Sequence, residues 1–472
     1  LVIAEDEGQQ LNPNDTIGRT GIEREYDEVL RGKAGQRAFE VDADGTVVRE
    51  LAEESFPAEP GYDVQLTLDI DLQYAVELAL SQTIQDNSEN NEGAAVVLDP
   101  ETGGVLAMAS YPTFMPEDFT QGISNEDYAA MTLPGSGFPL NNKAIQGNYP
   151  PGSTFKPISA IAGLRNDLTS TNEIYVDTGV YFVEGCENES ESCRFQNAGA
   201  EEKGPVNLAQ SLTVSSDTYY YRIGDRSWNR RGQIGETPIQ DVAEEFGFDE
   251  QTGIDLPFED DGIVYDPALR AQVFEEFPDQ YLTGDWTTGD SVNLSIGQGD
   301  LQATPIQLAN AYAALLDDGR LRRPHVADRV LEQPSQGNPI IRDEIEPEVT
   351  REIDIPPSWR QSIMEGLMGV TQTGVGGTAG PAFEGFPHSA FPTGGKTGTF
   401  EKLNKPDSAV YVGFGPVRPG EVPDYVMAVV VPEAGGFGGD VAAPVVRNVF
   451  ELIASPEGLP AAPVTVDPDQ VQ

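Results

Sequence analysis

The sequence is poor in the residues that build metal centres. Among its 472 residues it has only two cysteines and two histidines. Cys186 and Cys193 bound a short polar loop with no histidine nearby, and two ligands cannot close a zinc site. A pair spaced to close a short loop favours a disulfide, and therefore an oxidising, extracytoplasmic compartment. The alternative is two free thiols.

Histidine is equally scarce, which bears on how a serine would be activated. His325 and His388 are the only two, and no Gly-x-Ser-x-Gly sequence surrounds Ser153. A histidine-based catalytic triad needs a histidine beside its serine, and in many such enzymes the serine lies in that motif. The sequence therefore gives little support for a triad of this kind. We therefore expect both histidines to be structural.

Long apolar runs are absent too. The best candidate, Tyr425–Val431, is far shorter than the roughly 18 residues of a membrane span, so we expect a buried strand there. The chain starts at Leu1, not at methionine. We expect a fragment or processed product whose N-terminal anchor lies outside the numbering.

Positive charge is the other deficit. The chain has 28 Lys and Arg against 78 Asp and Glu, a formal net charge of −50. Such a balance argues against nucleic acid or anionic lipid as a partner. The acidity favours a solvated, self-repelling surface over a specific cationic partner. Only seven of the basic residues are lysines, so a lysine beside a serine is not easily dismissed as a routine surface charge.

At 472 residues the chain is long enough for one large domain and a smaller one. In the N-terminal part we expect a helix over residues 22–30, a hairpin turned at Asp44-Gly45, and a linker over residues 56–61. A strand over residues 64–68 then opens the packed region. A helix over residues 72–84 follows, with its apolar residues on one stripe.

Later segments predict an antiparallel sheet. Residues 94–98 and 105–108 flank a turn sequence and read as a buried hairpin. Residues 411–414 and 425–431 are expected to pair with the strand that carries Lys396. Thr304-Pro305-Ile306-Gln307 is a capping box that opens a buried helix ending near residue 319.

Three short strings together describe one active site: Ser153-Thr154-Phe155-Lys156, Ser215-Ser216-Asp217 and Lys396-Thr397-Gly398-Thr399. Prolines before Ser153 place it at a helix N-terminus, where free N–H groups and the helix dipole favour an oxyanion. A lysine three residues later lies on the same face, so the pair can act as nucleophile and base.

A lysine is a base only when neutral, which requires its pKa to fall from about 10.4 to roughly 7. Burial and the charge of Lys396 both favour that shift for Lys156. Ser215 would relay a proton to the departing amine. Asp217 would hydrogen-bond Lys156 or the substrate, and its charge would partly oppose the shift.

The third string predicts a substrate-binding strand. Glycine there lets a substrate backbone approach closely, and the hydroxyls of Thr397 and Thr399 can hold a terminal carboxylate. Backbone N–H groups of Ser153 and Thr399 would form the oxyanion hole. Taken singly each string is weak, because a Ser-x-x-Lys helix is usually a solvated face. Their order and spacing together predict a serine acyl-transferring enzyme.

The three strings resemble those of penicillin-binding proteins and serine β-lactamases, and the chain further resembles class B penicillin-binding proteins of the elongation type. The remaining stretches that carry this likeness are Gly18–Glu23, Tyr26, Leu30–Gly32, Gly147–Pro157, Ser295–Gly299 and Thr304–Gln307. Asp217 departs from the asparagine of many members, but aspartate is frequent in the elongation type.

The resemblance implies an α+β fold: an antiparallel sheet flanked by helices, with a small N-terminal pedestal. It implies that residues 1–60 are the C-terminal part of the pedestal, or dimerisation, domain with a linker. Residues 61–458 would be the penicillin-binding transpeptidase domain and residues 459–472 a disordered tail. No glycosyltransferase segment precedes the pedestal, so we expect a monofunctional protein.

The function implied by the resemblance is peptidoglycan D,D-transpeptidation. A donor stem peptide would acylate Ser153 and expel D-alanine, and an amine on a neighbouring strand would take the acyl group. β-Lactams would acylate the same serine. The family uses no metal or organic cofactor. The expected partner is a membrane glycosyltransferase of the shape, elongation, division and sporulation family, at the extracytoplasmic face of the bacterial cell membrane.

Two alternatives use the same residues. A D,D-carboxypeptidase or β-lactamase would pass the acyl group to water, although the pedestal and the length argue against a β-lactamase. A β-lactam sensor or a scaffold would keep the site without turnover. Against a degenerate scaffold stands the intact set Ser153, Lys156, Ser215 and Lys396. The rate at which a penicillin label is lost would separate a hydrolase from the others.

Overall fold

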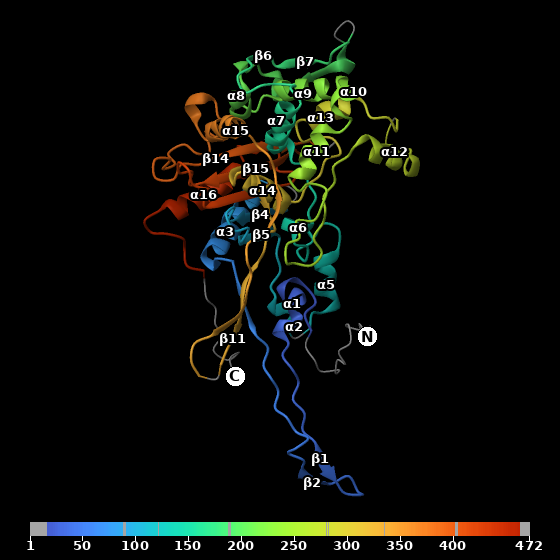
Figure 1. Ribbon diagram of the computed structural model, residues 1–472, viewed down its shortest axis with the longest axis vertical. Coiled ribbons are helices and arrows are strands. Elements are labelled where there is room, and N and C mark those ends of the chain that lie inside the picture. Colours follow the sequence, from blue (N-terminus) through green and yellow to red (C-terminus); the bar gives the residue numbers. More distant parts are fainter. Residues whose placement is uncertain are drawn as a thin grey trace. The chain divides into compact units, whose positions relative to one another are not determined.

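The computed structural model describes residues 17–87, 91–120, 122–186, 190–279, 281, 283–334, 336–401 and 405–462 (Figure 1). The chain divides into two compact units. The first takes in the described residues up to Thr67, with Asp255–Pro257 and His325–Glu346, and the second holds the rest. The first unit therefore includes two segments from much later in the sequence, which no local pattern indicated.

In the first unit the predicted helix over residues 22–30 is two short helices. They are α1 (Gly21–Glu25) and α2 (Asp27–Leu30). Tyr26 separates them, with a non-helical φ of −104° and ψ of 20°, and its hydroxyl donates to Asp255 at 2.7 Å. This contact to a distant residue of the same unit anchors Tyr26 at the break between the two helices.

The hairpin predicted at Asp44-Gly45 is confirmed by β1 (Phe39–Val41) and β2 (Val47–Glu50), which pair antiparallel. Residues 56–61, expected as a linker, instead form isolated bridges with Lys33 and Gln36. The strand expected over residues 64–68 is β3 (Asp63–Leu66). It lies in a three-stranded sheet with the strands β11 (Ala327–Glu332) and β12 (Ile340–Glu344), in the order β12-β11-β3.

The second unit is built on an antiparallel sheet of five strands in the order β14-β15-β16-β4-β5. Its strands are β4 (Gly93–Leu98), β5 (Val105–Tyr111), β14 (Gly394–Phe400), β15 (Ser408–Gly415) and β16 (Tyr425–Val431). The predicted hairpin is confirmed, and β15 pairs with the Lys396 strand as expected. The expected pairing of residues 425–431 with the Lys396 strand is wrong, because β16 lies between β15 and β4 in the sheet. Among the described residues the strand that carries Lys396 pairs with β15 alone, so it is an edge strand of the sheet.

Side chains alternate across this sheet, as the period of a strand requires. The side chains on one face of the sheet pack into a core with α3 (Ile70–Asn87) and α16 (Ala442–Ala454). The opposite face contacts α14 (Pro305–Leu316), which is buried along its whole length and begins at the predicted capping box of Thr304. Figure 1 shows these helices around the sheet. The α+β prediction, an antiparallel sheet flanked by helices, is confirmed.

Four further helices of this unit carry residues of the three predicted strings or lie next to them. They are α7 (Lys156–Arg165), α8 (Leu208–Thr213), α9 (Asp217–Asn229) and α15 (Pro357–Gly369). The other helices are α4 (Glu117–Thr120), α5 (Asn125–Thr132), α6 (Lys143–Gln146), α10 (Arg231–Ile234), α11 (Pro238–Glu245), α12 (Pro267–Glu276) and α13 (Thr288–Leu294). Short 3-10 turns are η1 (Gly152–Phe155), η3 (Glu191–Cys193), η4 (Ala198–Ala200) and η5 (Thr373–Val375).

Small two-stranded sheets complete the unit. Their strands are β6 (Tyr175–Asp177) with β9 (Gly204–Val206), β7 (Val180–Phe182) with β8 (Arg194–Gln196), and β10 (Arg320–Arg322) with β13 (Val349–Glu352). A disulfide joins Cys186 to Cys193 across the loop of the β7–β8 hairpin, which confirms the predicted bond.

None of the helices in the described ranges is both long enough and apolar enough to cross a bilayer. Of the tail predicted over residues 459–472, residues 463–472 lie outside the described residues.

Candidate active site

Ser153 lies in a single 3-10 turn, η1, that leads directly into α7. The structure thus places the serine one turn before the helix proper, which begins at Lys156. Side chains three residues apart in a 3-10 turn eclipse one another, so Ser153 and Lys156 stand on the same side. Lys156 is completely buried, whereas Ser153 is partly exposed. A substrate therefore reaches the serine before the lysine.

The turn that carries Ser153 lies directly against the edge strand β14. Gly152 has a φ of +55°, and a Cβ atom added to it would stand 2.6 Å from the carbonyl oxygen of Thr399. A Cβ on Gly398 would stand 2.6 Å from the carbonyl oxygen of Pro151. Both glycines are thus required for the close approach. The backbone of Thr399, including its N–H, consequently faces the serine turn.

Ser215 and Asp217 lie in the turn between α8 and α9. Ser216 is the N-cap of α9 and accepts a hydrogen bond from the backbone N–H of Tyr219 at 3.2 Å. Asp217 is the first residue of the helix. Ser215 itself has a φ of +55°, a left-handed conformation that costs a non-glycine residue about 1–2 kcal/mol. The packing around this turn must therefore hold it in place.

Two lysines from different elements converge on one hydroxyl. Lys396 Nζ lies 2.8 Å from Ser215 Oγ, and Lys156 Nζ lies 3.1 Å from the same atom. Lys156 also donates to the Ser215 carbonyl at 2.9 Å and to Asp217 Oδ1 at 2.7 Å. The structure thus brings together four of the predicted residues, from α7, the α8–α9 turn and β14. A hydroxyl between two amines can accept a proton from one and donate to the other.

Ser153 and Lys156, the predicted nucleophile and base, are not hydrogen-bonded to each other. All three hydrogen bonds of the Lys156 amine go to Ser215 and Asp217. Among the described residues, no hydrogen bond is made to the hydroxyl of Ser153. The reason is tertiary: the α8–α9 turn supplies better acceptors to the lysine than its neighbour in sequence does.

The two buried lysines are easier to deprotonate than lysines in water. Burial is the main cause that lowers the pKa of Lys156, because a buried ammonium loses its hydration. The negative charges of Asp217 and Asp177 oppose this, and the positive charge of Lys203 adds to it. Burial also holds the pKa of Lys396 well below its usual value, and the charge of Lys156 lowers it further. At least one amine of this pair can therefore serve as a base.

The predicted substrate-binding residues lie along β14. Thr397 and Thr399 share one face of the strand, and Lys396 and Gly398 share the other. The hydroxyl of Thr397 is 2.7 Å from that of Thr378, and the hydroxyl of Thr399 accepts from the N–H of Gly438 at 3.3 Å. Both threonine hydroxyls are thus held in fixed positions.

The sequence patterns missed three residues of this site. Thr378 and Gly438 fix the β14 hydroxyls. Tyr220 is fully buried, with its ring centroid 5.4 Å from Lys156 Nζ, so the ring face can stabilise an ammonium. Tyr220 follows Asp217 by three residues, and that proximity was the one available signal. Thr378 and Gly438 contact β14 only through tertiary packing.

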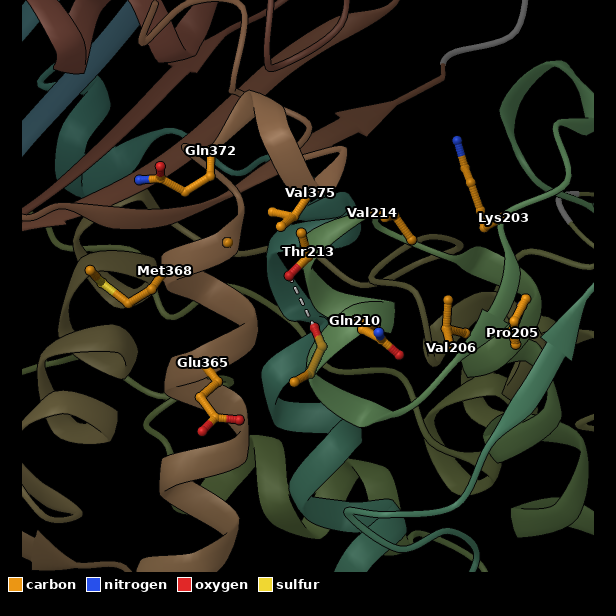
Figure 2. Close-up of a pocket in the computed structure, with 12 residues that line it drawn as sticks. Lys203, Pro205, Val206, Gln210, Thr213, Val214, Glu365, Met368, Gln372 and Val375 are labelled. Atoms are coloured by element: carbon orange, nitrogen blue, oxygen red, sulfur yellow. Dashed lines mark hydrogen bonds between the residues drawn. The ribbon is translucent and has the colours of Figure 1, made fainter. Parts of the chain in front are cut away.

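A pocket of about 620 Å³ adjoins the Ser215 turn (Figure 2). It lies between α8 and α15, and Val214, the residue before Ser215, forms part of its wall. Figure 2 shows Lys203 and Glu365 on opposite sides of it. The full lining is Lys203, Pro205, Val206, Ala209, Gln210, Thr213, Val214, Glu365, Met368, Gly369, Gln372 and Val375. This mixed lining suits a ligand that carries both charged and apolar groups.

The histidines take no part in the site. His325 is buried, and its carbonyl accepts from the Thr67 hydroxyl. His388 packs against the rings of Phe383 and Phe386, and burial lowers its pKa. Within the ranges that the structure describes, no group of three or more His, Cys, Asp and Glu side chains is arranged to hold a metal ion.

Two protein-family models match the chain. The penicillin binding protein transpeptidase domain matches residues 93–451, and the penicillin-binding protein dimerisation domain matches residues 2–66. The chain is also 33% identical over 383 residues to the peptidoglycan D,D-transpeptidase MrdA of Escherichia coli strain K12. That alignment covers 81% of this chain and 54% of the relative, so the chain spans about half of that relative's length.

Solved structures show the same similarity. PBP2 of Pseudomonas aeruginosa, in complex with WCK 5153, has a TM-score of 0.71 and 30% identity, covering 94% of this chain and 86% of that one. A chain from a structure of a peptidoglycan synthase complex, which coordinates polymerization and crosslinking, has a TM-score of 0.75 and 30% identity. It covers 94% of this chain and 71% of that one.

Proposed function

Because this chain belongs to the family of penicillin-binding protein transpeptidases, we propose that it is a peptidoglycan D,D-transpeptidase that cross-links stem peptides through an acyl-enzyme on Ser153. The observation that carries the proposal is the convergence of Lys156 and Lys396 on the hydroxyl of Ser215. Burial favours the neutral form of these amines. A base and a proton relay therefore stand beside a serine that a substrate can reach.

In the acylation step, Ser153 Oγ attacks the carbonyl carbon of the penultimate residue of the donor stem peptide. Neutral Lys156 accepts the hydroxyl proton, after exchanging one of its contacts in the α8–α9 turn for Ser153. The oxyanion is stabilised by the backbone N–H groups of Ser153 and Thr399. The close packing of Gly152 against Thr399 supports this placement.

Collapse of the intermediate breaks the peptide bond and expels D-alanine. Its amine needs a proton, and Ser215 passes it from the Lys156 ammonium to the leaving nitrogen. Asp217 hydrogen-bonds Lys156 and favours its charged form at this stage. In the second half-reaction the acceptor amine takes the place of D-alanine, loses a proton along the same route and releases the cross-linked peptide.

The donor peptide is proposed to lie along the free edge of β14. Extended peptides add to exposed sheet edges through main-chain hydrogen bonds. Lys396 then attracts the terminal carboxylate, which the hydroxyls of Thr397 and Thr399 bind, and Gly398 leaves room for the approach. β-Lactams, which carry a carboxylate beside a reactive amide, are proposed to acylate Ser153 in the same orientation.

The assignment of domains and partners is part of the proposal. We assign residues 1–60 to the pedestal domain and linker, residues 61–458 to the transpeptidase domain, and residues 459–472 to a tail. The two family models support the first two assignments. We propose a membrane glycosyltransferase of the shape, elongation, division and sporulation family as partner, supported by the peptidoglycan synthase complex among the similar structures.

The site would then work at the extracytoplasmic face of the bacterial cell membrane. The disulfide between Cys186 and Cys193 supports an oxidising compartment.

The first test is intact-mass analysis after incubation with benzylpenicillin, on the parent protein and on Ser153→Ala. We expect a covalent adduct on the parent and none on the variant. Ser362→Ala, which alters an exposed hydroxyl of α15 bonded only to its own helix, is the matched control and should be labelled like the parent. A folded parent that forms no adduct would overturn the assignment.

A second measurement separates transfer from hydrolysis. The acyl-enzyme formed with a donor stem peptide is offered an acceptor stem peptide, and cross-linked and hydrolysed products are quantified by mass spectrometry. A transpeptidase gives cross-linked dimer that increases with acceptor concentration. Hydrolysed donor as the sole product, with rapid loss of a penicillin label, would establish a carboxypeptidase or β-lactamase instead.

A further inference from the structure

Two buried polar residues outside the three catalytic strings meet beneath the Ser215 turn. Asp177 is the last residue of β6, and Asn197 directly follows β8. Their exposed fractions are 1% and 2%. Burial of a carboxylate and an amide is costly unless their hydrogen bonds are satisfied, so the partners of this pair indicate what it does.

Asn197 caps the helix that begins with Asp217. Its Oδ1 accepts from the backbone N–H of Asp217 at 2.9 Å and from that of Thr218 at 3.1 Å. These are the first two residues of α9, whose N–H groups have no partner within the helix. Ser216 caps the third N–H, that of Tyr219. A side chain from 20 residues upstream thus completes the cap at the catalytic turn.

Asp177 in turn orients the amide of Asn197 and the hydroxyl of Ser216. Asn197 Nδ2 donates to both carboxylate oxygens, at 2.9 and 3.0 Å. The Ser216 hydroxyl donates to Oδ2 at 2.5 Å, and the N–H of Gly179 donates to Oδ1 at 2.8 Å. Because Asp177 accepts only, it fixes which end of the Asn197 amide faces α9.

The β7–β8 hairpin holds Asn197 against α9. Tyr181 from β7 donates to Asp225 Oδ2 on α9 at 2.6 Å, and Tyr221 from α9 donates to the Gln196 carbonyl at 3.2 Å. The Cys186–Cys193 disulfide closes the loop of this hairpin. Asn197 is therefore held by a hairpin that is itself hydrogen-bonded to α9.

These contacts hold the two residues that directly follow the strained residue Ser215. Ser216 and Asp217 are both anchored on the pair, so the left-handed conformation of Ser215 is maintained from its C-terminal side. That conformation directs the Ser215 hydroxyl between the two lysines. Asp177 also attracts the charge of Lys156, which raises the pKa of that lysine, as Asp217 does. Burial and Lys203 act in the opposite direction.

We propose that Asp177 and Asn197 are positioning residues for acyl transfer, which hold the Ser215–Asp217 turn so that Ser215 stays between Lys156 and Lys396. The inference rests on the proposed function, because acylation of Ser153 is its readout. Both residues are buried, so their effect comes through Ser216, Asp217 and the α9 cap.

The test measures the second-order rate constant for acylation by a fluorescent penicillin, across pH, on purified folded protein. Misplacement of a catalytic group by about 1 Å can cost on the order of 100-fold. We expect Asn197→Ala to acylate roughly 10- to 100-fold more slowly than the parent. We expect Asp177→Asn to shift the rise of the acylation rate to lower pH, because it removes a charge that favours the Lys156 ammonium.

An exchange variant keeps the test decisive if Asn197→Ala folds poorly. Asn197→Asp alone sets two carboxylates face to face and should acylate slowly. Asp177→Asn combined with Asn197→Asp restores one amide opposite one carboxylate, with the helix N–H groups still capped. We expect the exchange to recover most of the parent rate. The control is Asp266→Ala, which removes the N-cap of α12 and should lower the melting temperature without changing the acylation rate or its pH profile.

The outcomes are distinguishable. A parent that is not acylated defeats the proposed function itself. An acylated parent with Asn197→Ala at the same rate and pH profile, or an exchange variant that folds but is no faster than Asn197→Asp, overturns only this inference. Slower acylation of Asn197→Ala, recovery in the exchange variant and a shifted profile for Asp177→Asn support it.

Discussion

Lys156 and Ser215 are joined by two hydrogen bonds across 59 residues of sequence: Lys156 Nζ donates to the Ser215 carbonyl at 2.9 Å and to its hydroxyl at 3.1 Å. The first contact fixes the lysine on the backbone of the turn. The second links it to the only hydroxyl that also contacts Lys396, within the described residues. Ser215 thereby links the two buried amines of the site through one hydroxyl.

Replacing this hydroxyl should slow acylation without unfolding the protein. Proton transfer by a positioned group contributes typically 10²- to 10⁴-fold, so we expect Ser215→Ala to lose roughly 10²-fold or more in the acylation rate constant. Stopped-flow measurement with a fluorescent penicillin checks this. Ser362→Ala, which removes a hydroxyl of α15 that bonds only its own helix, is the control. A Ser215→Ala rate within about two-fold of the parent rate would rule out the relay.

The pH dependence of acylation should move in opposite directions in two variants. In the proposed mechanism Lys156 is a neutral base, so the rate should rise with pH through its pKa. Asp217 raises that pKa and Lys203 lowers it. Asp217→Asn should therefore shift the rise to lower pH, and Lys203→Gln should shift it, by less, to higher pH. Acylation profiles from about pH 5 to 10 decide this, and shifts of the same sign in both variants would contradict it.

Gly152 should be irreplaceable for a steric reason beyond its φ. We expect Gly152→Ala to slow acylation at least roughly 10-fold, because the added Cβ meets the Thr399 carbonyl at 2.6 Å and displaces the serine turn. Gly420→Ala is a matched control: its φ is +79°, but nothing lies within 4 Å of the added atom. Both variants should lose about 1–2 kcal/mol of folding stability, because alanine is strained at a positive φ. Thermal melts and acylation rates together separate strain from collision, and equal acylation by the two variants would refute the close packing.

The Cys186–Cys193 bond should contribute to stability. Its sequence separation of 7 corresponds to a short closed loop, for which chain entropy predicts about 2–3 kcal/mol. We expect the double variant Cys186→Ser/Cys193→Ser to unfold at a lower denaturant concentration. Reduction of the parent should reproduce this, while reduction of the double variant should change nothing. An unchanged midpoint in the reduced parent would show that the bond is energetically neutral.

Much of the second unit could be predicted because its signals are local. Alternation and turn residues gave β4 and β5, and Thr304 with Gln307 marked the start of α14. In the first unit the apolar periodicity predicted one helix across Tyr26, but the structure has two helices that meet there. The Tyr26 hydroxyl donates to Asp255, a residue far away in the sequence. Local periodicity carries no information about such a distant partner.

The candidate site also has features that short segments predict and features that only tertiary contacts create. The spacing of Ser153 and Lys156 and the strand character of Lys396 are properties of short segments, and they hold in the structure. The left-handed φ of Ser215 and the role of Thr378 follow from contacts with segments far away in sequence. Asp177 and Asn197 carry no motif at all, because their importance lies in which N–H groups they reach.

The sequence alone determined which residue types were available for chemistry: one serine before a lysine at a helix start, a second serine with an aspartate, a lysine strand, and almost no histidine. Tertiary packing alone decided that Lys156 binds the Ser215 turn and not Ser153. It also decided that burial lowers the pKa of both lysines. The physical reason is that α7, the α8–α9 turn and β14 must pack together before the lysine side chains lose contact with water and meet at one hydroxyl. No single segment of sequence contains that arrangement.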